Sequence, residues 1–207
     1  MNTWVFAGLP VLSLWIAILE ADGVLIGQWM FSRPLIVGPV IGLLLGDPAS
    51  GLTLGALFEL FCLDRPPVGG KMPFNGTVAA GGAVLFAGGP HAAPLALAFP
   101  AGLALGCVHR FVESRIRDWR SGLSLRAAGG VESGGRVDWD RLLLPSIGLQ
   151  VGTTALLLYL SGGIIAPWAV RAWDAAPVFL REGFESALRT APWIGLGLLV
   201  QSLWRRK

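Results

Sequence analysis

Charged side chains are scarce in this chain, and their scarcity excludes an ordinary soluble domain. Only 14% of the 207 residues are Asp, Glu, Lys or Arg, whereas 54% are hydrophobic. A typical soluble domain carries about 25% charged residues. The 29 glycines and 14 prolines interrupt this apolar background frequently. We therefore expect a polytopic, all-α membrane protein with broken or re-entrant helices in its N-terminal half.

Cysteine clusters, metal-ligand clusters and phosphate-binding motifs are also missing. The two cysteines, Cys62 and Cys107, lie in separate apolar segments without CxxC spacing, so neither a disulfide nor a zinc site is expected. No GxxxxGK loop or nucleophile motif supports an enzyme with its own catalytic centre. We expect no catalytic residue, no cofactor and no metal. Because the positive charges gather in loops and at the C-terminus, nucleic-acid binding is not expected either.

The stretch from Gly27 to Gly82 lacks apolar runs that are long enough to cross a bilayer. A straight helical crossing needs about 20 apolar residues, yet Pro34 to Gly46 and Leu52 to Leu63 each supply only about a dozen. Two half-spans of this kind predict a cavity lined by protein, because broken backbone in a membrane must find partners. Glycines at four-residue spacing predict close packing of the two segments, namely Gly38, Gly42 and Gly46, and Gly51 and Gly55.

Ionisable residues inside these apolar segments need a partner or a task. A charge at the bilayer centre costs about 3 kcal/mol on insertion scales. Glu59 is the clearest case, because the large apolar residues of LFELF surround it. It binds a polar ligand, lies at an interface or pairs with Arg33, and these alternatives stay open. Asp47, which precedes Pro48, is interpreted instead as a turn residue at the end of a half-helix.

Ordered short motifs in this stretch resemble one known family. They are Gly27-Gln28, Ser32-Arg33-Pro34-Leu35, Gly38-Pro39, Gly42-Leu43-Leu44-Leu45-Gly46-Asp47, Gly51-Leu52, Gly55-Ala56, Glu59-Leu60, Pro67-Val68-Gly69-Gly70 and Pro73. The stretch is similar to the IIC membrane subunit of the mannose/fructose/sorbose family of sugar phosphotransferase systems. The resemblance implies a multi-pass protein of the cytoplasmic (inner) membrane that binds and translocates a hexose-like sugar. It also implies a IID membrane subunit as partner and soluble IIA/IIB phosphocarrier subunits that carry out the phosphoryl transfer.

Six polar residues of this stretch are expected to form the sugar site. They are Glu59, Gln28, Asn75, Arg33, Thr77 and Lys71. Such side chains suit a polyol, because each hydroxyl that leaves water needs a donor or an acceptor. Asn75 stands where the family tends to carry an aspartate, and its amide offers both a donor and an acceptor. Alternatively, Asn75 caps a helix that begins there and points the positive end of that helix at the cavity.

Polar residues outside this stretch are interpreted as interfacial. Glu20 and Asp22 follow the first apolar run, Trp4 to Leu19, either as ligands at a helix break or, the favoured alternative, as interfacial residues. No Lys or Arg precedes that run, so we expect a retained membrane helix rather than a signal peptide. His91 and His109 are the only histidines, and neither stands in an evident polar site. Both are expected in loops or at interfaces rather than as phosphoryl acceptors.

We expect a single integral membrane domain over residues 1–207. Its 1–113 half carries the motifs, and 141–207 forms C-terminal membrane helices. Residues 114–140 form a cytoplasmic loop rich in arginine, with a helical continuation over 115–120 as an open alternative. Half-spans and glycine-lined faces need protein neighbours in the bilayer, so homo- and hetero-oligomers are expected. A non-transporting binding or regulatory subunit on the same scaffold is the alternative, favoured by Asn75 and by a chain shorter than is usual in the family.

Overall fold

The protein is described by a computed structural model that covers residues 3–23, 25, 27–62, 74–132 and 139–205. Within these ranges the regular elements are helices and there is no strand, which confirms the all-α class. Some helical segments are long and apolar enough to cross a membrane, namely Trp4–Asp22, Leu95–Gly129 and Trp139–Asp174. Others are apolar but shorter, namely Pro34–Leu44, Pro48–Cys62 and Gly76–Gly88. The fold is therefore that of a multi-pass membrane protein with short helices in its N-terminal half.

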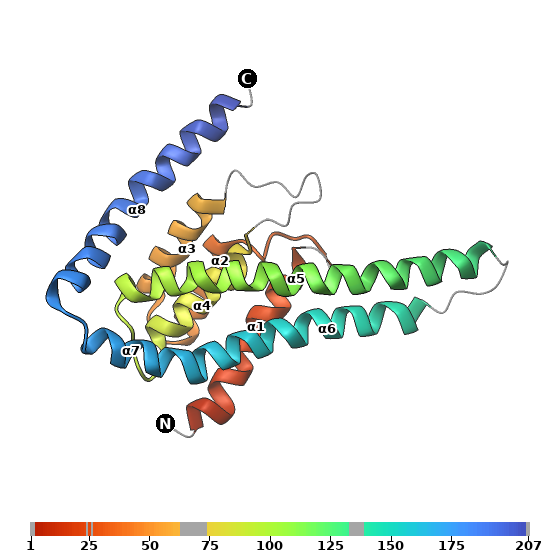
Figure 1. The fold of residues 1–207 in the computed structure, drawn as a ribbon, viewed down its shortest axis with the longest axis horizontal. Helices are drawn as coiled ribbons and strands as arrows, with labels where there is room; N and C mark the ends of the chain where they lie inside the picture. The colour runs from red at the N-terminus through yellow and green to blue at the C-terminus, as the bar shows by residue number, and fades with distance from the viewer. Residues whose placement is uncertain (1–2, 24, 26, 63–73, 133–138, 206–207) are drawn as a thin grey trace.

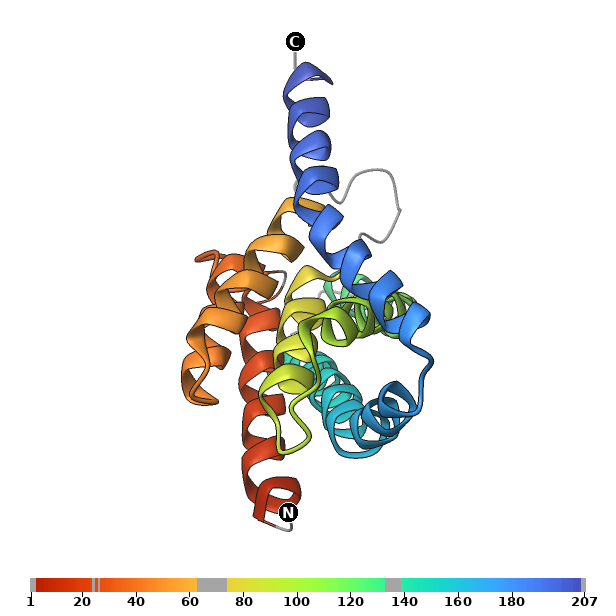
Figure 2. The ribbon, with the colours of Figure 1, turned by 90° about the vertical axis from the view of Figure 1, so that its left-hand side faces the viewer.

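The helices follow one another in an order that brings distant segments together. They are η1 (Trp4–Gly8), α1 (Leu9–Asp22), α2 (Pro34–Leu44), α3 (Pro48–Cys62), α4 (Gly76–Gly88), α5 (Leu95–Glu132), α6 (Trp139–Leu160), η2 (Ser161–Ile165), α7 (Ala166–Asp174) and α8 (Val178–Arg205). Figure 1 shows α5 and α6 running side by side and projecting together beyond the other helices. Figure 2 shows the C-terminal half of α8 standing clear of the bundle, with the two chain termini at opposite ends.

Helix α4 lies at the centre of the bundle because its sequence, GTVAAGGAVLFAG, is made of small and apolar residues. Its residues from Thr77 to Phe86 are all buried. A Cβ atom added at Gly81 would meet the side chain of Ile16 in α1, and one added at Gly82 would meet Leu105 in α5. Helices α1 and α5 therefore pack directly on α4, as small residues permit. The start of this short helix also lies within the bundle, since Thr77 is already buried.

Helices α2 and α3 are the two short segments expected from the sequence, and they pack against each other as an antiparallel hairpin. Their 11 and 15 residues span about 16 Å and about 22 Å, less than the ~30 Å hydrocarbon core. Gly38, Gly42, Gly51 and Gly55 face one another so closely that a Cβ atom on any of them would meet backbone. Gly46 was expected to take part in this contact, but nothing lies within 4 Å of a Cβ atom added there. Its φ of +82° forms the turn, a conformation that glycine adopts without strain.

Asp47 lies in the turn between α2 and α3, where the sequence predicts a turn residue. The side chain of Asp47 accepts a hydrogen bond at Oδ1 from the backbone N–H of Ser50, at 3.0 Å. This N–H lies in the first turn of α3, where backbone donors have no partner within the helix. Asp47 therefore caps α3, and its interpretation as a turn residue at the end of a half-helix is confirmed.

The segment 114–140, expected to be a loop, is mostly helical in the part that the structure describes. Helix α5 continues to Glu132 and α6 begins at Trp139, while residues 133–138 lie outside the described ranges. The run RIRDWRSGLSLRAA is rich in Arg, Leu and Ala, which are strong helix formers. A single glycine inside such a run costs only about 1 kcal/mol relative to Ala. The helical continuation considered for residues 115–120 therefore extends to Glu132, and the described part of this segment is mainly helix rather than loop.

We predict that Gly51→Ala destabilises the protein by about 1–3 kcal/mol, the usual cost of overpacking. The added Cβ would lie against the carbonyl oxygen of Gly38 and 2.9 Å from Cα of Gly42, and neither backbone atom can move without shifting a helix. The matched control is Gly152→Ala in α6, where nothing lies within 4 Å of the added Cβ. That variant should be neutral or stabilising by up to about 1 kcal/mol. Thermal unfolding in detergent would compare them, and equal melting temperatures would contradict the close α2–α3 contact.

Candidate functional site

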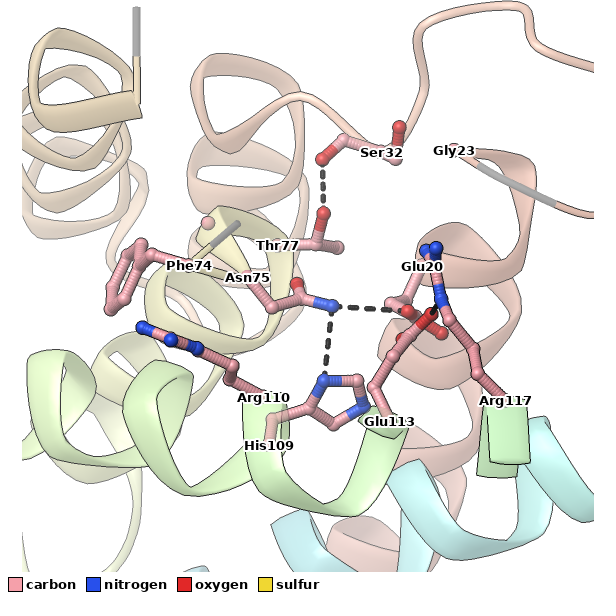
Figure 3. Close-up of a pocket in the computed structure, with 11 residues that line it drawn as sticks. Glu20, Gly23, Ser32, Phe74, Asn75, Thr77, His109, Arg110, Glu113 and Arg117 are labelled. Carbon is pink, nitrogen blue, oxygen red and sulfur yellow. Dashed lines mark hydrogen bonds and ion pairs between the residues drawn. The ribbon is translucent and has the colours of Figure 1, made fainter. Parts of the chain in front are cut away.

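A cavity of about 180 Å³ opens where the end of α1, the start of α4 and the middle of α5 meet. Its wall includes Phe74 and carries a set of polar side chains, namely Glu20, Asn75, Thr77, His109, Glu113 and Arg117. Figure 3 shows Glu20, Asn75, His109 and Glu113 converging on one another across this space. The cavity is therefore a polar site inside an otherwise apolar helix bundle.

Glu20 supplies a carboxylate that is only 4% exposed. Asn75 donates a hydrogen bond to its Oε1 from Nδ2, at 3.0 Å. Gln150 of α6 donates from Nε2 to both carboxylate oxygens, at 3.1 Å each. A buried carboxylate without such donors would carry a large desolvation cost. Glu20 therefore ties α1 to the start of α4 and to α6.

The amide of Asn75 is oriented by helix α4. Its Oδ1 accepts a hydrogen bond from the backbone N–H of Val78 at 3.0 Å, the usual N-cap interaction. Its Nδ2 consequently points at Oε1 of Glu20 and at Nδ1 of His109, which lies 3.1 Å away. The prediction that Asn75 caps a helix whose positive end faces the cavity is confirmed. Capping and lining the cavity turn out to be parts of one arrangement rather than alternatives.

His109 is fully buried, contrary to its expected place in a loop or at an interface. It lies on α5 with Nδ1 facing Asn75 and Nε2 2.8 Å from Oγ1 of Thr154 on α6. These partners are 34 and 45 residues away in sequence, so no local pattern shows them. The four-residue spacing from His109 to Glu113 is the one local indication, because it puts both side chains on the same face of a helix.

Gln150 links the two buried carboxylates of the site. Its Nε2 donates to Oε2 of Glu113 at 3.0 Å as well as to Glu20, while its Oε1 accepts from Nη2 of Arg120 at 3.0 Å. Arg117 pairs with Glu113 at 3.1 Å, one helical turn away. Each carboxylate thus has amide partners, and Glu113 has an arginine as well. The local sequence around Gln150 gave no reason to include it in the site.

Of the two alternatives for Glu20 and Asp22, the favoured one placed them at a membrane interface, and the structure corrects it, because both are buried. Asp22 is 7% exposed and accepts hydrogen bonds from the backbone N–H groups of Trp29, at 2.9 Å, and Ser32, at 3.4 Å. These bonds shape the segment that leads from α1 to α2 along the edge of the cavity. The two carboxylates are buried because α1 ends inside the protein, where later helices cover its C-terminal turn.

Of the six residues expected around a sugar, the structure brings Asn75 and Thr77 to this cavity. The hydroxyl of Thr77 donates to the carbonyl oxygen of Ser32, which holds the cavity wall together. Gln28 is exposed, has a left-handed φ of +56° and does not line the cavity. Lys71 lies outside the described residues.

Glu59 and Arg33 pair with each other away from the lining of this cavity. Their side chains form an ion pair of 2.5 Å between α3 and the start of α2. The second oxygen of Glu59 accepts from the backbone N–H of Leu35 at 3.4 Å, in the first turn of α2. Of the alternatives left open for Glu59, pairing with Arg33 is the contact that the structure shows. Neither Glu59 nor Arg33 is among the residues that line the cavity.

The ligand atoms of Glu20, His109 and Glu113 all lie within 4.8 Å of one another, a spacing that a metal ion could use. Amide N–H groups from Asn75 and Gln150 already point at these atoms, and Thr154 occupies the second nitrogen of His109. A cation would have to displace these donors. A ligand with hydroxyl groups, which both donate and accept, fits the arrangement better.

Sequence comparison finds one family that matches nearly the whole chain. The family described as the PTS system sorbose-specific IIC component matches residues 7–207. A curated relative, the N-acetylgalactosamine permease IIC component 1 of Escherichia coli (strain K12), is 28% identical over 177 residues. The match covers 84% of this chain and 64% of the relative, so the chain spans less than two thirds of that relative's length.

Solved structures share the fold at low sequence identity. A chain described as a membrane protein has a TM-score of 0.77 at 18% identity, covering 95% of this chain and 80% of that chain. A chain from the cryoEM structure of the mannose transporter ManYZ in complex with microcin E492 (MceA) has a TM-score of 0.68 at 17% identity. That similarity covers 94% of this chain and 79% of the other. Such likenesses establish a shared membrane-protein fold.

We predict that Gln150→Ala destabilises the protein, because Glu20 and Glu113 both lose a buried donor. Asn75 and Arg117 still bond to these carboxylates, but a lost hydrogen bond to a charged group costs about 1.5–3 kcal/mol. The control is Thr153→Ala on the same helix, whose hydroxyl donates to the backbone carbonyls of Leu149 and Gln150 and to no side chain of the network. That change should stay within about 0.5 kcal/mol. Thermal unfolding in detergent measures both, and equal stability of the two variants would show that the amide of Gln150 does not hold the carboxylates.

Proposed function

This chain belongs to the sorbose-specific IIC family of the phosphotransferase system, and on that basis we propose that it is a sugar-translocating subunit of the cytoplasmic (inner) membrane. It binds a hexose-like sugar in the cavity beside Asn75 and moves it together with a IID membrane partner. Soluble IIA and IIB subunits phosphorylate the sugar, so this chain has no catalytic residue of its own. The matched relative is a permease component by name, which supports this assignment.

The observation that carries the proposal is the buried polar network that opens into the cavity. Two carboxylates, Glu20 and Glu113, offer acceptors to sugar hydroxyls, and Arg117 offers donors. Hydrogen bonds between ligand hydroxyls and charged groups are among the stronger ones in proteins. The ring of Phe74 adds an apolar wall, which suits the C–H face of a sugar ring. A neutral polyol therefore finds partners here for both its polar and its apolar surfaces.

The position of α4 supports a site within the membrane. This helix has 13 residues and starts at the cavity, so it is too short to cross the bilayer alone. Broken-helix transporters bind their substrates near the bilayer midplane, where the ends of half-helices meet. The α2–α3 hairpin, also too short to cross, packs against α4. These short helices place helix termini and faces of small residues inside the protein. Translocation sites in broken-helix transporters are built from such helix termini.

The names of the similar proteins provide the first sugars to test. They are N-acetylgalactosamine from the curated relative, sorbose from the family description and mannose from one structural neighbour. Each carries several hydroxyl groups on a six-carbon framework, which is the chemistry that the cavity fits. The complex of this chain with its IID partner is the material for binding measurements.

We predict that Glu20→Gln weakens sugar binding by roughly 1.5–3 kcal/mol, the value of a hydrogen bond to a charged group. The substitution keeps the size of the side chain and removes one carboxylate. Glu59→Gln is the matched comparison, because Glu59 is held by Arg33 outside the cavity lining. Calorimetric titration of the complex with each candidate sugar gives both affinities, and unfolding temperatures show that each variant is folded. Weakened binding in Glu59→Gln alone would locate the sugar at Glu59, Gln28 and Arg33, as the sequence predicted.

We predict that sugar uptake requires the IID partner, because half-spans and glycine-lined faces need protein neighbours. Uptake is measured in cells that lack their own system, with this chain expressed alone and with its partner. Uptake by this chain alone would contradict the proposal. Sugar binding without uptake by the complex would identify the chain as the non-transporting binding subunit instead.

A further inference from the structure

The orientation of the Asn75 amide can be assigned from its surroundings without ambiguity. Oxygen and nitrogen of an asparagine amide are normally hard to tell apart and are assigned from hydrogen bonds. Here one amide atom lies 3.0 Å from the backbone N–H of Val78, which can only donate. That atom is therefore the oxygen. The other atom is the NH₂ group, and it faces Glu20 at 3.0 Å and His109 at 3.1 Å.

This orientation decides which nitrogen of His109 carries the proton. Because the NH₂ group of Asn75 donates to Nδ1, that nitrogen must be the acceptor and carries no hydrogen. Nε2 lies 2.8 Å from the hydroxyl of Thr154, which can accept its N–H. A neutral imidazole with its hydrogen on Nε2 satisfies both contacts at once.

The charged side chains near His109 form hydrogen bonds or ion pairs with residues other than His109. On α1, Glu20 is bonded to Asn75 and Gln150. On α5, Glu113 pairs with Arg117, and Arg120 bonds to Gln150 and Ser146. Figure 3 shows the side chain of Arg110 pointing away from the network. The described partners that α4 and α6 contribute to His109 itself are neutral, so nothing in its hydrogen bonds requires an imidazolium.

We infer that His109 is a positioning residue for Asn75, held as the neutral tautomer with its proton on Nε2. Glu20 and His109 use both hydrogens of the Asn75 amide, and Val78 uses one lone pair of its oxygen. Asn75 therefore presents only an acceptor to a ligand, so a ligand hydroxyl must donate to it. The same contacts leave Nδ1 covered by Asn75 and Nε2 covered by Thr154, so neither nitrogen is available to accept a phosphoryl group. The consequence for ligand binding rests on the proposed sugar site, whereas the tautomer does not.

The tautomer is tested on the full-length protein without sugar, by ¹⁵N NMR of histidine-labelled samples. His91→Asn removes the second histidine and assigns the signals. We expect His109 to show an unprotonated Nδ1 and a protonated Nε2 near neutral pH. Asn75→Asp keeps the cap on α4 but cannot donate to Nδ1, so a proton should appear on Nδ1. A wild-type spectrum with Nδ1 protonated, or identical spectra for the two proteins, would overturn the inference.

The positioning role is tested by replacing His109 with residues that keep or remove the acceptor. His109→Asn can place a carbonyl oxygen near the position of Nδ1, whereas His109→Leu cannot accept at all. Sugar affinity of the complex should fall at least about fivefold in His109→Leu, and His109→Asn should recover most of that loss. A folded His109→Asn protein that recovers nothing would overturn the positioning role. Failure of the wild-type complex to bind any of the sugars would refute the proposed function and leave the tautomer result intact.

Discussion

The carboxylate of Glu20 is buried inside an apolar helix bundle, and the arrangement of the helices around it must supply its hydrogen-bond donors. Taking such a group out of water is costly unless donors surround it, and donors cannot come from lipid. Asn75 brings one from the start of α4 and Gln150 brings another from α6, 130 residues further along the chain. His109 and Glu113 join this network from α5. One set of hydrogen bonds therefore ties four helices together, and the cavity opens where three of them, α1, α4 and α5, meet.

Short helices create the opportunity for such a site. A helix that ends inside a membrane protein leaves backbone N–H or C=O groups without partners, so its end must be capped by side chains or by a ligand. Asn75 caps α4 and Asp47 caps α3, in each case with a side-chain oxygen. The paired glycines of α2 and α3 let this hairpin stay compact. The ends of these short helices are therefore stable inside the protein. At the capped end of α4, the side chain of Asn75 lines the cavity.

Glu59 and Glu20 have different proposed roles because they have different partners in the structure. Glu59 meets Arg33 and the first turn of α2, so its charge is neutralised by an ion pair that needs no ligand. Glu20 meets neutral amides instead, and its network opens into a cavity whose remaining space suits hydroxyl groups. Both residues interrupt apolar sequence, and only the identity of their partners separates them. That difference is why the proposed sugar site is centred on Glu20.

The sequence by itself determined the features that depend on local pattern. Apolar content and run length predicted an all-α membrane protein with half-spans, glycine spacing predicted the α2–α3 contact, and the ordered motifs identified the family. Local chemistry also predicted the turn at Asp47 and the cap at Asn75, because both features join residues only a few positions apart. Only the tertiary structure shows which residues form the polar network around Glu20. The partners of Glu20 and His109 lie 34 to 130 residues away, and they meet only because α1, α4, α5 and α6 pack around one point. Helical periodicity fixes which face a side chain occupies, but packing decides what that face meets.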